Sequence, residues 1–221
     1  MSLADGWERN ASEWASLVRS GGDRLYERNL VAFRELLPPP GRLTVDVGCG
    51  EGRLARELRV GGHPVVGVDA SETLVALARE ADPDDDYRVA DAAALPFAEG
   101  EADLVISFMV LMDLEDLDGA LREAARVLEP GGRLVASLVH PLATAGDYAG
   151  HRASFLVDHP YLEERRLQFP LGASESTTVH RPLSRYVIAL AEAGFVVERL
   201  HELTARPDAL VPFFLLLRAR R

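Results

Sequence analysis

The chain of 221 residues contains no lysine, so its 24 basic residues are all arginines. Enzymes that form a Schiff base through a lysine side chain, including those that use pyridoxal phosphate, need an amine that this chain lacks. A Walker-type phosphate loop requires a lysine as well. These reaction classes are therefore excluded before any motif is considered.

Cysteine and long apolar runs are also scarce. Cys49 is the only cysteine, so the chain can form neither an internal disulfide nor a cluster of thiolate metal ligands. No apolar run is long enough to span a bilayer, and the opening residues, MSLADGWERN, lack the basic and apolar regions of a secretion signal. We expect a cytoplasmic protein without a membrane-spanning segment.

Basic residues are fewer than acidic residues, 24 against 35, which gives a formal net charge of -11. Such a surface repels phosphate backbones, which disfavours DNA or RNA as a substrate. Solubility is the simpler role for the acidity.

The order of apolar segments predicts an α/β fold. Two helices are expected before the Pro38–Gly41 break, and strands then alternate with helices. The expected strands are 43–47, 64–68, 87–90, 102–107 and 133–139, and the expected helices are 52–60, 71–80 and 117–128. This alternation predicts an open parallel sheet covered by helices on both faces.

The C-terminal part follows a different pattern. A helix over 183–193 precedes strands at 195–203 and 212–218, and the connection between these strands is too short for a crossover helix. We therefore expect the last two strands to pair antiparallel. We interpret the chain as one domain with four parts: an N-terminal helical cap (1–41), a cofactor-binding core (42–139), a substrate-pocket insertion (140–182) and the C-terminal helix and strand pair (183–221).

The segment VDVGCGEGR, residues 45–53, lies between the first strand and the first helix of the core, where open parallel sheets bind ligands. Gly48 and Gly50 allow a sharp turn and a close approach to a ligand. Arg53 occupies the place of the third glycine of a dinucleotide fingerprint, which weakens a nicotinamide dehydrogenase interpretation. Asp46 places a carboxylate beside the turn, which suits a cationic ligand better than a pyrophosphate.

Two further carboxylates follow the next two strands. Asp69 lies twenty-one residues after Gly48, at a strand end where a carboxylate can accept hydrogen bonds from both hydroxyls of a ribose. Asp91 follows the third strand, where its side chain and the neighbouring amide can address the amine of an adenine. These positions predict a nucleoside ligand.

These motifs resemble the class I S-adenosylmethionine-dependent methyltransferases, in the small-molecule group called type 11. The similar run covers about 43–140 and includes VDVGCGEGR, GVDAS, DAAALPF and EAARVLEPGGRLV. The resemblance implies S-adenosylmethionine as cofactor and a Rossmann-like sheet of seven strands, mostly parallel, with an antiparallel last strand. Its implied cofactor-binding residues are Asp46, Gly48, Cys49, Gly50, Asp69, Ala70, Asp91, Ala92, Ser107 and Phe108.

In detail, the resemblance assigns Asp46 to the turn and the methionine amino group, and Asp69 to the ribose. It implies that Ala70 lines the adenine face and that Asp91 and Ala92 meet the adenine edge. Ser107 and Phe108 approach the methionine portion. One departure is the run 110–113, Val-Leu-Met-Asp, where relatives often carry an LHH-like sequence, so the usual residue gives no guide to chemistry here.

The methyl acceptor is expected to bind at the insertion 140–182, because long insertions at this edge of a sheet often build substrate pockets. His140, at the end of the fifth strand, is our candidate general base, and Tyr148 is a second catalytic candidate. Trp14, His151 and Tyr161 are candidate substrate contacts. The histidine spacing does not suit a metal site.

Several alternatives stay open at this stage. The acceptor can be a small molecule with an oxygen, nitrogen or carbon nucleophile, or a tRNA or protein, although the negative charge disfavours the last two. A cofactor-binding subunit without its own activity is a further option. The acceptor's identity and the oligomeric state are not predicted.

Overall fold

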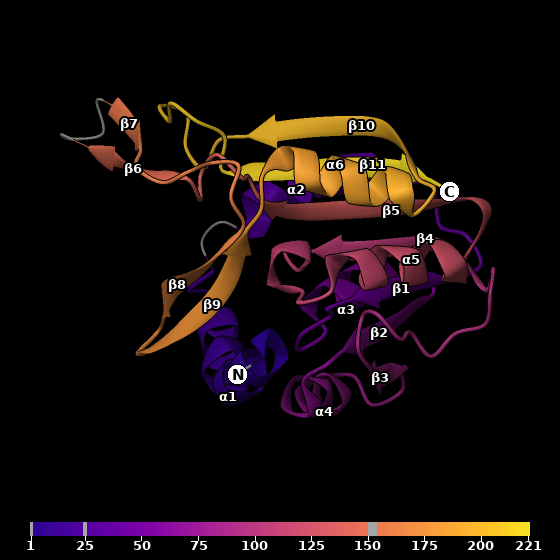
Figure 1. Cartoon of the computed structure of the whole chain (residues 1–221). Helices are drawn as coiled ribbons and strands as arrows, with labels where there is room; N and C mark the ends of the chain where they lie inside the picture. Colours follow the sequence, from indigo (N-terminus) through magenta and orange to yellow (C-terminus); the bar gives the residue numbers. More distant parts are fainter. Residues whose placement is uncertain (1, 24–25, 150–153) are drawn as a thin grey trace.

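The computed structural model describes residues 2–23, 26–149 and 154–221. A seven-stranded sheet lies at its centre, in the order β10-β11-β5-β4-β1-β2-β3 (Figure 1). The strands are β1 (Thr44–Val47), β2 (Val65–Asp69), β3 (Tyr87–Val89), β4 (Ala102–Phe108), β5 (Leu128–Val139), β10 (Val196–Leu203) and β11 (Phe214–Arg220). The order reverses direction at β1 and β4, which creates a crevice at their carboxyl ends.

Strands β1 to β5 pair in parallel, whereas β11 runs antiparallel to both β5 and β10. The predicted mostly parallel sheet with an antiparallel last strand is confirmed. The expected antiparallel pairing of the last two strands is confirmed as well. Strand β5 begins at Leu128, earlier than the predicted strand 133–139, and includes the Pro-Gly-Gly sequence.

Helices cover both faces of the sheet (Figure 1). Helices α2 (Tyr26–Leu36), α3 (Arg53–Val60) and α4 (Glu72–Ala81) contribute Leu30, Phe33, Leu54, Leu58 and Val75 to one apolar cluster. Helices α5 (Leu117–Val127) and α6 (Leu183–Glu192) contribute Leu117, Leu121, Tyr186 and Leu190 to the other. The buried strands are nearly continuous apolar runs because each packs against helices on both sides.

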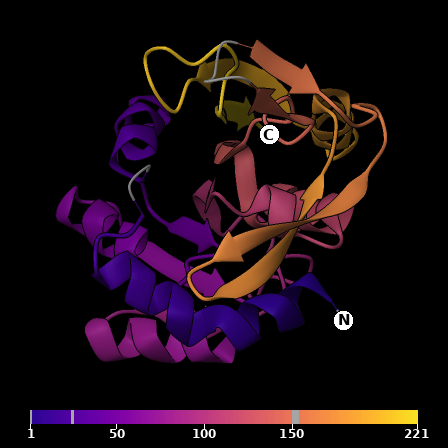
Figure 2. The same cartoon turned by 90° about the vertical axis from the view of Figure 1, so that its left-hand side faces the viewer.

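Helix α1 (Leu3–Arg19) lies apart from the sheet and contacts α4 on one side and strand β9 on the other (Figure 2). Glu8 accepts hydrogen bonds from the hydroxyls of Ser71 and Thr73, the latter at 2.5 Å, at the start of α4. Glu13 accepts a hydrogen bond from the Ser174 hydroxyl at 2.5 Å. These carboxylates hold α1 across the crevice.

The insertion between β5 and α6 forms two antiparallel hairpins that the sequence analysis did not predict. They pair β6 (Gly146–Ala149) with β7 (Ser154–Val157), and β8 (Arg165–Leu171) with β9 (Ser174–His180). The second hairpin extends from the sheet toward α1 (Figures 1 and 2). In the described part of the chain, no helix is long and apolar enough to cross a bilayer.

Candidate functional site

A cavity of about 970 Å³ opens at the carboxyl ends of the central strands. Its walls come from the turn after β1, the ends of β2 and β4, helix α1 and the insertion. Ligand pockets commonly measure about 300–1,000 Å³, so this volume suits a cofactor and a second molecule together.

The glycine turn forms the floor of the cavity. Gly48 and Gly50 have φ angles of 79° and 57°, in the left-handed region that glycine tolerates best. A Cβ atom on Gly48 would lie 2.3 Å from a methyl group of Val110, so the segment after β4 packs directly on this residue. At Gly50 the nearest atom would be the Trp14 indole nitrogen at 4.0 Å, which leaves the backbone open to a ligand.

Asp69 lies at the end of β2 and holds the turn in place. Its Oδ2 accepts a hydrogen bond from the Gly50 amide at 2.8 Å, and its Oδ1 accepts one from the Ser71 amide at 2.9 Å. Burial raises the pKa of Asp69 despite these bonds. Each carboxylate oxygen can accept a second hydrogen bond, so this geometry leaves room for ribose hydroxyls.

Asp46 is buried in β1, with 1% of its surface exposed. Its Oδ2 has no hydrogen-bond partner within the described residues. Burial, together with the neighbouring charge of Asp69, raises the pKa of Asp46 to about 7. An unpartnered buried carboxyl beside the glycine turn fits the amino group of a cationic ligand.

The other predicted cofactor residues differ in position. Asp91 is exposed at the rim of the cavity, where its Oδ1 accepts a hydrogen bond from the Ala93 amide at 2.8 Å. Ala70 and Ala92 line the same wall. Cys49 is buried, and burial raises the pKa of its thiol, so it is a packing residue and not a nucleophile.

Phe108 and Ser107 end β4 but face different surroundings. Phe108 lines the cavity and packs edge-to-face against Tyr26 and Phe33, with ring centroids 5.4 and 5.0 Å apart. Ser107 is buried and is not among the described residues that line the cavity. The structure thus brings nine of the ten predicted cofactor residues to one cavity, namely Asp46, Gly48, Cys49, Gly50, Asp69, Ala70, Asp91, Ala92 and Phe108.

His140, the candidate base, is buried beside the last two strands and does not line the cavity. Its Nε2 lies 2.7 Å from Glu202 Oε1, and its Nδ1 accepts a hydrogen bond from the Leu142 amide at 3.0 Å. Burial lowers the pKa of His140, although Glu202 opposes this effect. Because both ring nitrogens have partners, this geometry gives His140 a structural role rather than contact with an acceptor.

The predicted tyrosines are also structural. The Tyr148 hydroxyl accepts a hydrogen bond from the Leu210 amide at 2.9 Å. The Tyr161 hydroxyl accepts one from the Leu183 amide at 3.1 Å, at the start of α6. Neither tyrosine is among the described lining residues, whereas Trp14 is. His151 lies outside the described residues.

Asp113 is a candidate that the sequence analysis missed. It ends the short 3-10 helix η1 (Leu111–Asp113), lines the cavity and is 9% exposed. Its Oδ1 has no hydrogen-bond partner in the part of the chain that the structure describes. Burial raises the pKa of Asp113 to about 7, against opposing effects of Thr178, Arg181 and Trp7. The signal was the run 110–113, where the sequence departs from the motif that the resemblance implies and carries a carboxylate.

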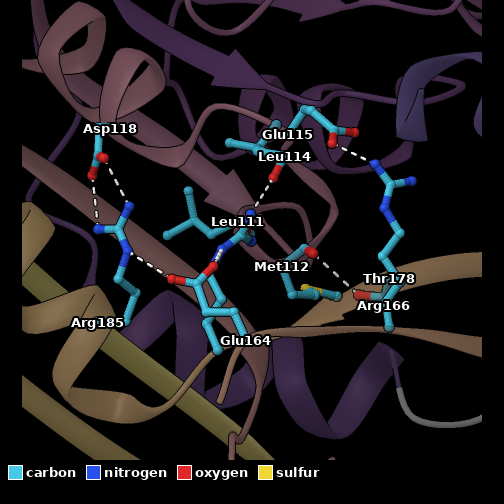
Figure 3. Close-up of polar contacts among 10 residues, drawn as sticks. Leu111, Met112, Leu114, Glu115, Asp118, Glu164, Arg166, Thr178 and Arg185 are labelled. Atoms are coloured by element: carbon cyan, nitrogen blue, oxygen red, sulfur yellow. Dashed lines mark hydrogen bonds and ion pairs between the residues drawn. The ribbon is translucent and has the colours of Figure 1, made fainter. Parts of the chain in front are cut away.

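Residues of the insertion hold the backbone of η1 through polar contacts (Figure 3). The buried Arg181 donates to the Leu114 carbonyl at 2.7 Å and to the Leu111 carbonyl at 3.4 Å. The Thr178 hydroxyl donates to the Met112 carbonyl at 3.2 Å. Arg181 therefore holds the backbone of η1 and of the residue that follows it.

Further ion pairs surround this network (Figure 3). Arg185 pairs with Asp118 at 2.7 Å and with Glu164 at 3.0 Å, and Arg166 pairs with Glu115. They join the helix α5 and the segment after η1 to the insertion and α6. No group of three or more potential metal ligands occurs in residues 2–23, 26–149 and 154–221.

Comparisons with known proteins identify the family of the chain. A family model described as a methyltransferase domain matches residues 45–136, which contain the glycine turn, Asp69 and Asp91. The crystal structure of an S-adenosylmethionine-dependent methyltransferase from Mesorhizobium loti is 32% identical, with a TM-score of 0.73, and the match covers 86% of this chain and 96% of that one. The chain belongs to the class I S-adenosylmethionine-dependent methyltransferases.

Curated relatives of this methyltransferase differ in their named acceptors. A malonyl-[acyl-carrier protein] O-methyltransferase of Erwinia pyrifoliae is 36% identical over 129 residues, which are 58% of this chain and 47% of the relative. A ubiquinone/menaquinone biosynthesis C-methyltransferase of Caulobacter vibrioides is 32% identical over 148 residues, which are 59% of this chain and 58% of the relative. The chain therefore spans about half the length of these relatives.

Proposed function

We propose that this chain is an enzyme that transfers a methyl group from S-adenosylmethionine to a small-molecule acceptor. The observation that carries the proposal is Asp46, whose buried and unpartnered Oδ2 lies beside the open glycine turn. A cationic ligand removes the cost of burying this carboxylate, whereas a pyrophosphate increases it.

The residues at the strand ends suit the separate parts of the cofactor. We assign Asp69 to the ribose hydroxyls and Asp46 to the methionine amino group. Ala70 and Ala92 offer small apolar walls to the adenine, and Asp91 stands at its edge. We call this set of residues, with the glycine turn and Phe108, the cofactor half of the cavity.

When bound, S-adenosylmethionine supplies a reactive methyl group on a sulfonium, so the cofactor carries the difficult chemistry. The chain mainly positions the acceptor and excludes water. Helix α1 serves the second task, because Trp7 and Trp14 line the cavity and pack edge-to-face with centroids 5.8 Å apart. We propose that η1, Trp7 and the described insertion residues that line the cavity, Thr144, Arg165, Phe169 and Thr178 among them, form the acceptor half of the cavity.

The acceptor's nucleophile is a separate question, since the relatives' names include both O- and C-methylation. A tRNA or protein acceptor remains the less favoured alternative because of the net charge of -11. A non-catalytic cofactor-binding subunit is distinguished by turnover, because it would bind the cofactor without transferring the methyl group. We expect the protein to act in the cytoplasm.

The proposal is tested by thermal unfolding with S-adenosylhomocysteine and, separately, with NAD. We expect S-adenosylhomocysteine to raise the midpoint temperature and NAD to leave it unchanged, because only the former carries the cationic amino group. A screen of metabolite pools for methyl transfer from labelled S-adenosylmethionine then tests for an enzyme. Stabilisation by NAD alone would refute the proposal.

A further inference from the structure

The acceptor half of the cavity contains an ionisable side chain that the cofactor does not explain. Asp113 reaches this part from η1, next to apolar walls from Trp7, Met112 and Phe169. It lies on the segment that follows β4, and Met109 in the same segment has a φ of 63°. A non-glycine residue in this conformation is strained and is held there by its surroundings.

The groups around Asp113 do not satisfy its Oδ1. Arg181 directs its guanidinium to the Leu111 and Leu114 carbonyls and to Glu164, the last at 3.2 Å. The Thr178 hydroxyl donates to the Met112 carbonyl. Asp113 lines the cavity, and its Oδ1 has no hydrogen-bond partner among the described residues.

Burying a carboxyl oxygen of this kind costs free energy unless a hydrogen-bond donor reaches it. The contacts of Arg181 and Thr178 with η1 keep the Asp113 carboxyl in position, so the site does not have to reorganise when a ligand donor binds. A molecule that occupies the acceptor half can supply this donor. A nucleophile that carries hydrogen, either an amine or a hydroxyl, meets this requirement.

The charge of the cavity favours the amine. Its described lining includes ten carboxylate side chains but only two guanidinium groups, those of Arg53 and Arg165. Arg53 already pairs with Asp23 at 2.8 Å. Such a wall attracts cations and repels anions, so a protonated amine is stabilised on entry.

Arg165 offers a second contact of opposite polarity. It donates through Nη2 to the Thr144 carbonyl at 2.7 Å, while its Nη1 is buried without a partner among the described residues. An oxygen elsewhere on the acceptor can receive this N–H. Amines that also carry such an oxygen are therefore expected to bind more tightly than simple amines.

We propose that Asp113 is the acceptor-binding carboxylate of this methyltransferase and that the acceptor is an amine, whose protonated nitrogen donates to Oδ1. The proposal rests on the proposed function. In the bound state one N–H bond of the ammonium breaks and an O–H bond forms on Asp113. The electron pair stays on nitrogen, which thereby becomes a nucleophile.

The elevated pKa of Asp113 supports this role as a proton acceptor. A carboxyl with a pKa of about 7 is closer in basicity to an amine than an ordinary carboxyl is, so the proton transfer is less unfavourable. Thr178 on β9, Arg181 between β9 and α6, and Trp7 on α1 moderate the effect of burial.

Binding of matched probes tests the proposal on the intact chain with S-adenosylhomocysteine present. The probes are 2-phenylethylamine, phenylalanine, 2-phenylethanol and 3-phenylpropionate, extended by a panel of alkyl and aryl amines with the alcohols and carboxylates of the same skeletons. We expect binding of amines to this complex, measured by calorimetry. In a separate reaction with S-adenosylmethionine, which supplies the methyl group, we expect methylation at nitrogen, located by mass spectrometry. Preference for the alcohols or carboxylates, or binding of no probe to the cofactor-loaded protein, would overturn it.

The variant Asp113→Asn keeps the shape of the side chain and removes its charge. We expect it to weaken amine binding about tenfold or more, because a charge-assisted hydrogen bond is lost, and to bind S-adenosylhomocysteine normally. Asp84→Asn, an exposed position outside the cavity with the same charge change, is the matched control and should bind amines normally. Equal amine binding by both variants would refute the role of Asp113.

These measurements separate the two proposals. If S-adenosylhomocysteine does not bind the wild-type chain, the proposed function fails and the amine proposal fails with it. If it binds but amines do not, only the amine proposal fails. If Asp113→Asn does not fold, the preference of the wild-type chain among amines, alcohols and carboxylates still decides the matter.

Discussion

The cofactor half and the acceptor half of the cavity are built in different ways. In the cofactor half, strand ends and tight turns fix each group, as when Asp69 binds the amides of Gly50 and Ser71. In the acceptor half, side chains distant in sequence hold η1, as when Arg181 binds the carbonyls of Leu111 and Leu114. The first construction depends on backbone geometry that few sequences satisfy, whereas the second can be rebuilt with other side chains. This difference explains how one cofactor site can serve many acceptors.

The largest effect is expected on the free energy of unfolding, from a substitution in the glycine turn of the cofactor half. Gly48→Ala adds a Cβ that meets Val110 and forces a left-handed conformation on alanine, so we expect a loss of about 2–5 kcal/mol in the free energy of unfolding. Gly50→Ala, which meets no atom closer than 4.0 Å, should lose only about 1–2 kcal/mol. Urea denaturation of both variants measures the difference. Equal losses would show that packing on Val110 does not restrict the turn.

Because the cofactor half is built from strand ends and tight turns, its residues could be predicted from the sequence. Asp46, Gly48 and Asp69 were predictable because parallel strands bring their ends to one edge and the spacing along the chain reports the turns between them. The hairpins of the insertion were not predictable in this way. Their partly polar strands carry a weak pattern, and their positions depend on contacts such as Glu13 with Ser174.

His140 shows the limit of this reasoning. Its place at the end of β5 suggested a group directed into the crevice. Instead, β11 lies beside β5, and β10, which pairs with β11, supplies Glu202 as a partner. Asp113 was overlooked for the opposite reason. It lies in an irregular segment where neither helical nor strand periodicity indicates which way a side chain points.

The next largest effect is expected from removing the proposed contact between Asp69 and the cofactor. Asp69→Ala removes the proposed ribose acceptor and the partners of two backbone amides, so we expect the affinity for S-adenosylhomocysteine to fall about 10–100-fold. Calorimetric titration measures this change, with Asp84→Ala as the control for loss of an acidic side chain. If Asp69→Ala binds as the wild type does, the ribose assignment is wrong.

The pH dependence of cofactor binding tests Asp46. Its pKa of about 7 in the free protein lies above the usual 3.8, so its carboxyl must lose a proton to bind the cationic amino group. We expect the affinity for S-adenosylhomocysteine to rise about tenfold between pH 6 and pH 8. Asp46→Asn should abolish the rise, and a rise of equal size in this variant would assign it to another group.

The raised pKa of Asp46 also affects the stability of the free protein, which we expect to fall as the pH rises, whereas the cofactor affinity rises. Because the folded state holds the Asp46 proton more tightly than the unfolded state, this contribution is complete below about pH 4 and is lost as the pH rises toward 7. Urea denaturation without ligand should therefore show a loss of stability over this range that is smaller in Asp46→Asn. A loss of the same size in the variant would contradict the shift.

The smallest effect on turnover is expected at His140, although the sequence favoured it as the base. His140→Gln keeps a donor near Glu202, and neither ring nitrogen of the wild type is free to reach an acceptor. We expect methyl transfer to change less than about twofold, whereas loss of a general base costs about 100–10,000-fold. Initial rates with saturating cofactor measure this, and normal S-adenosylhomocysteine binding confirms that the variant folds. A loss of 100-fold or more would identify His140, at the end of β5, as the general base. It would also contradict the contrast between a rigid cofactor half and an acceptor half centred on Asp113.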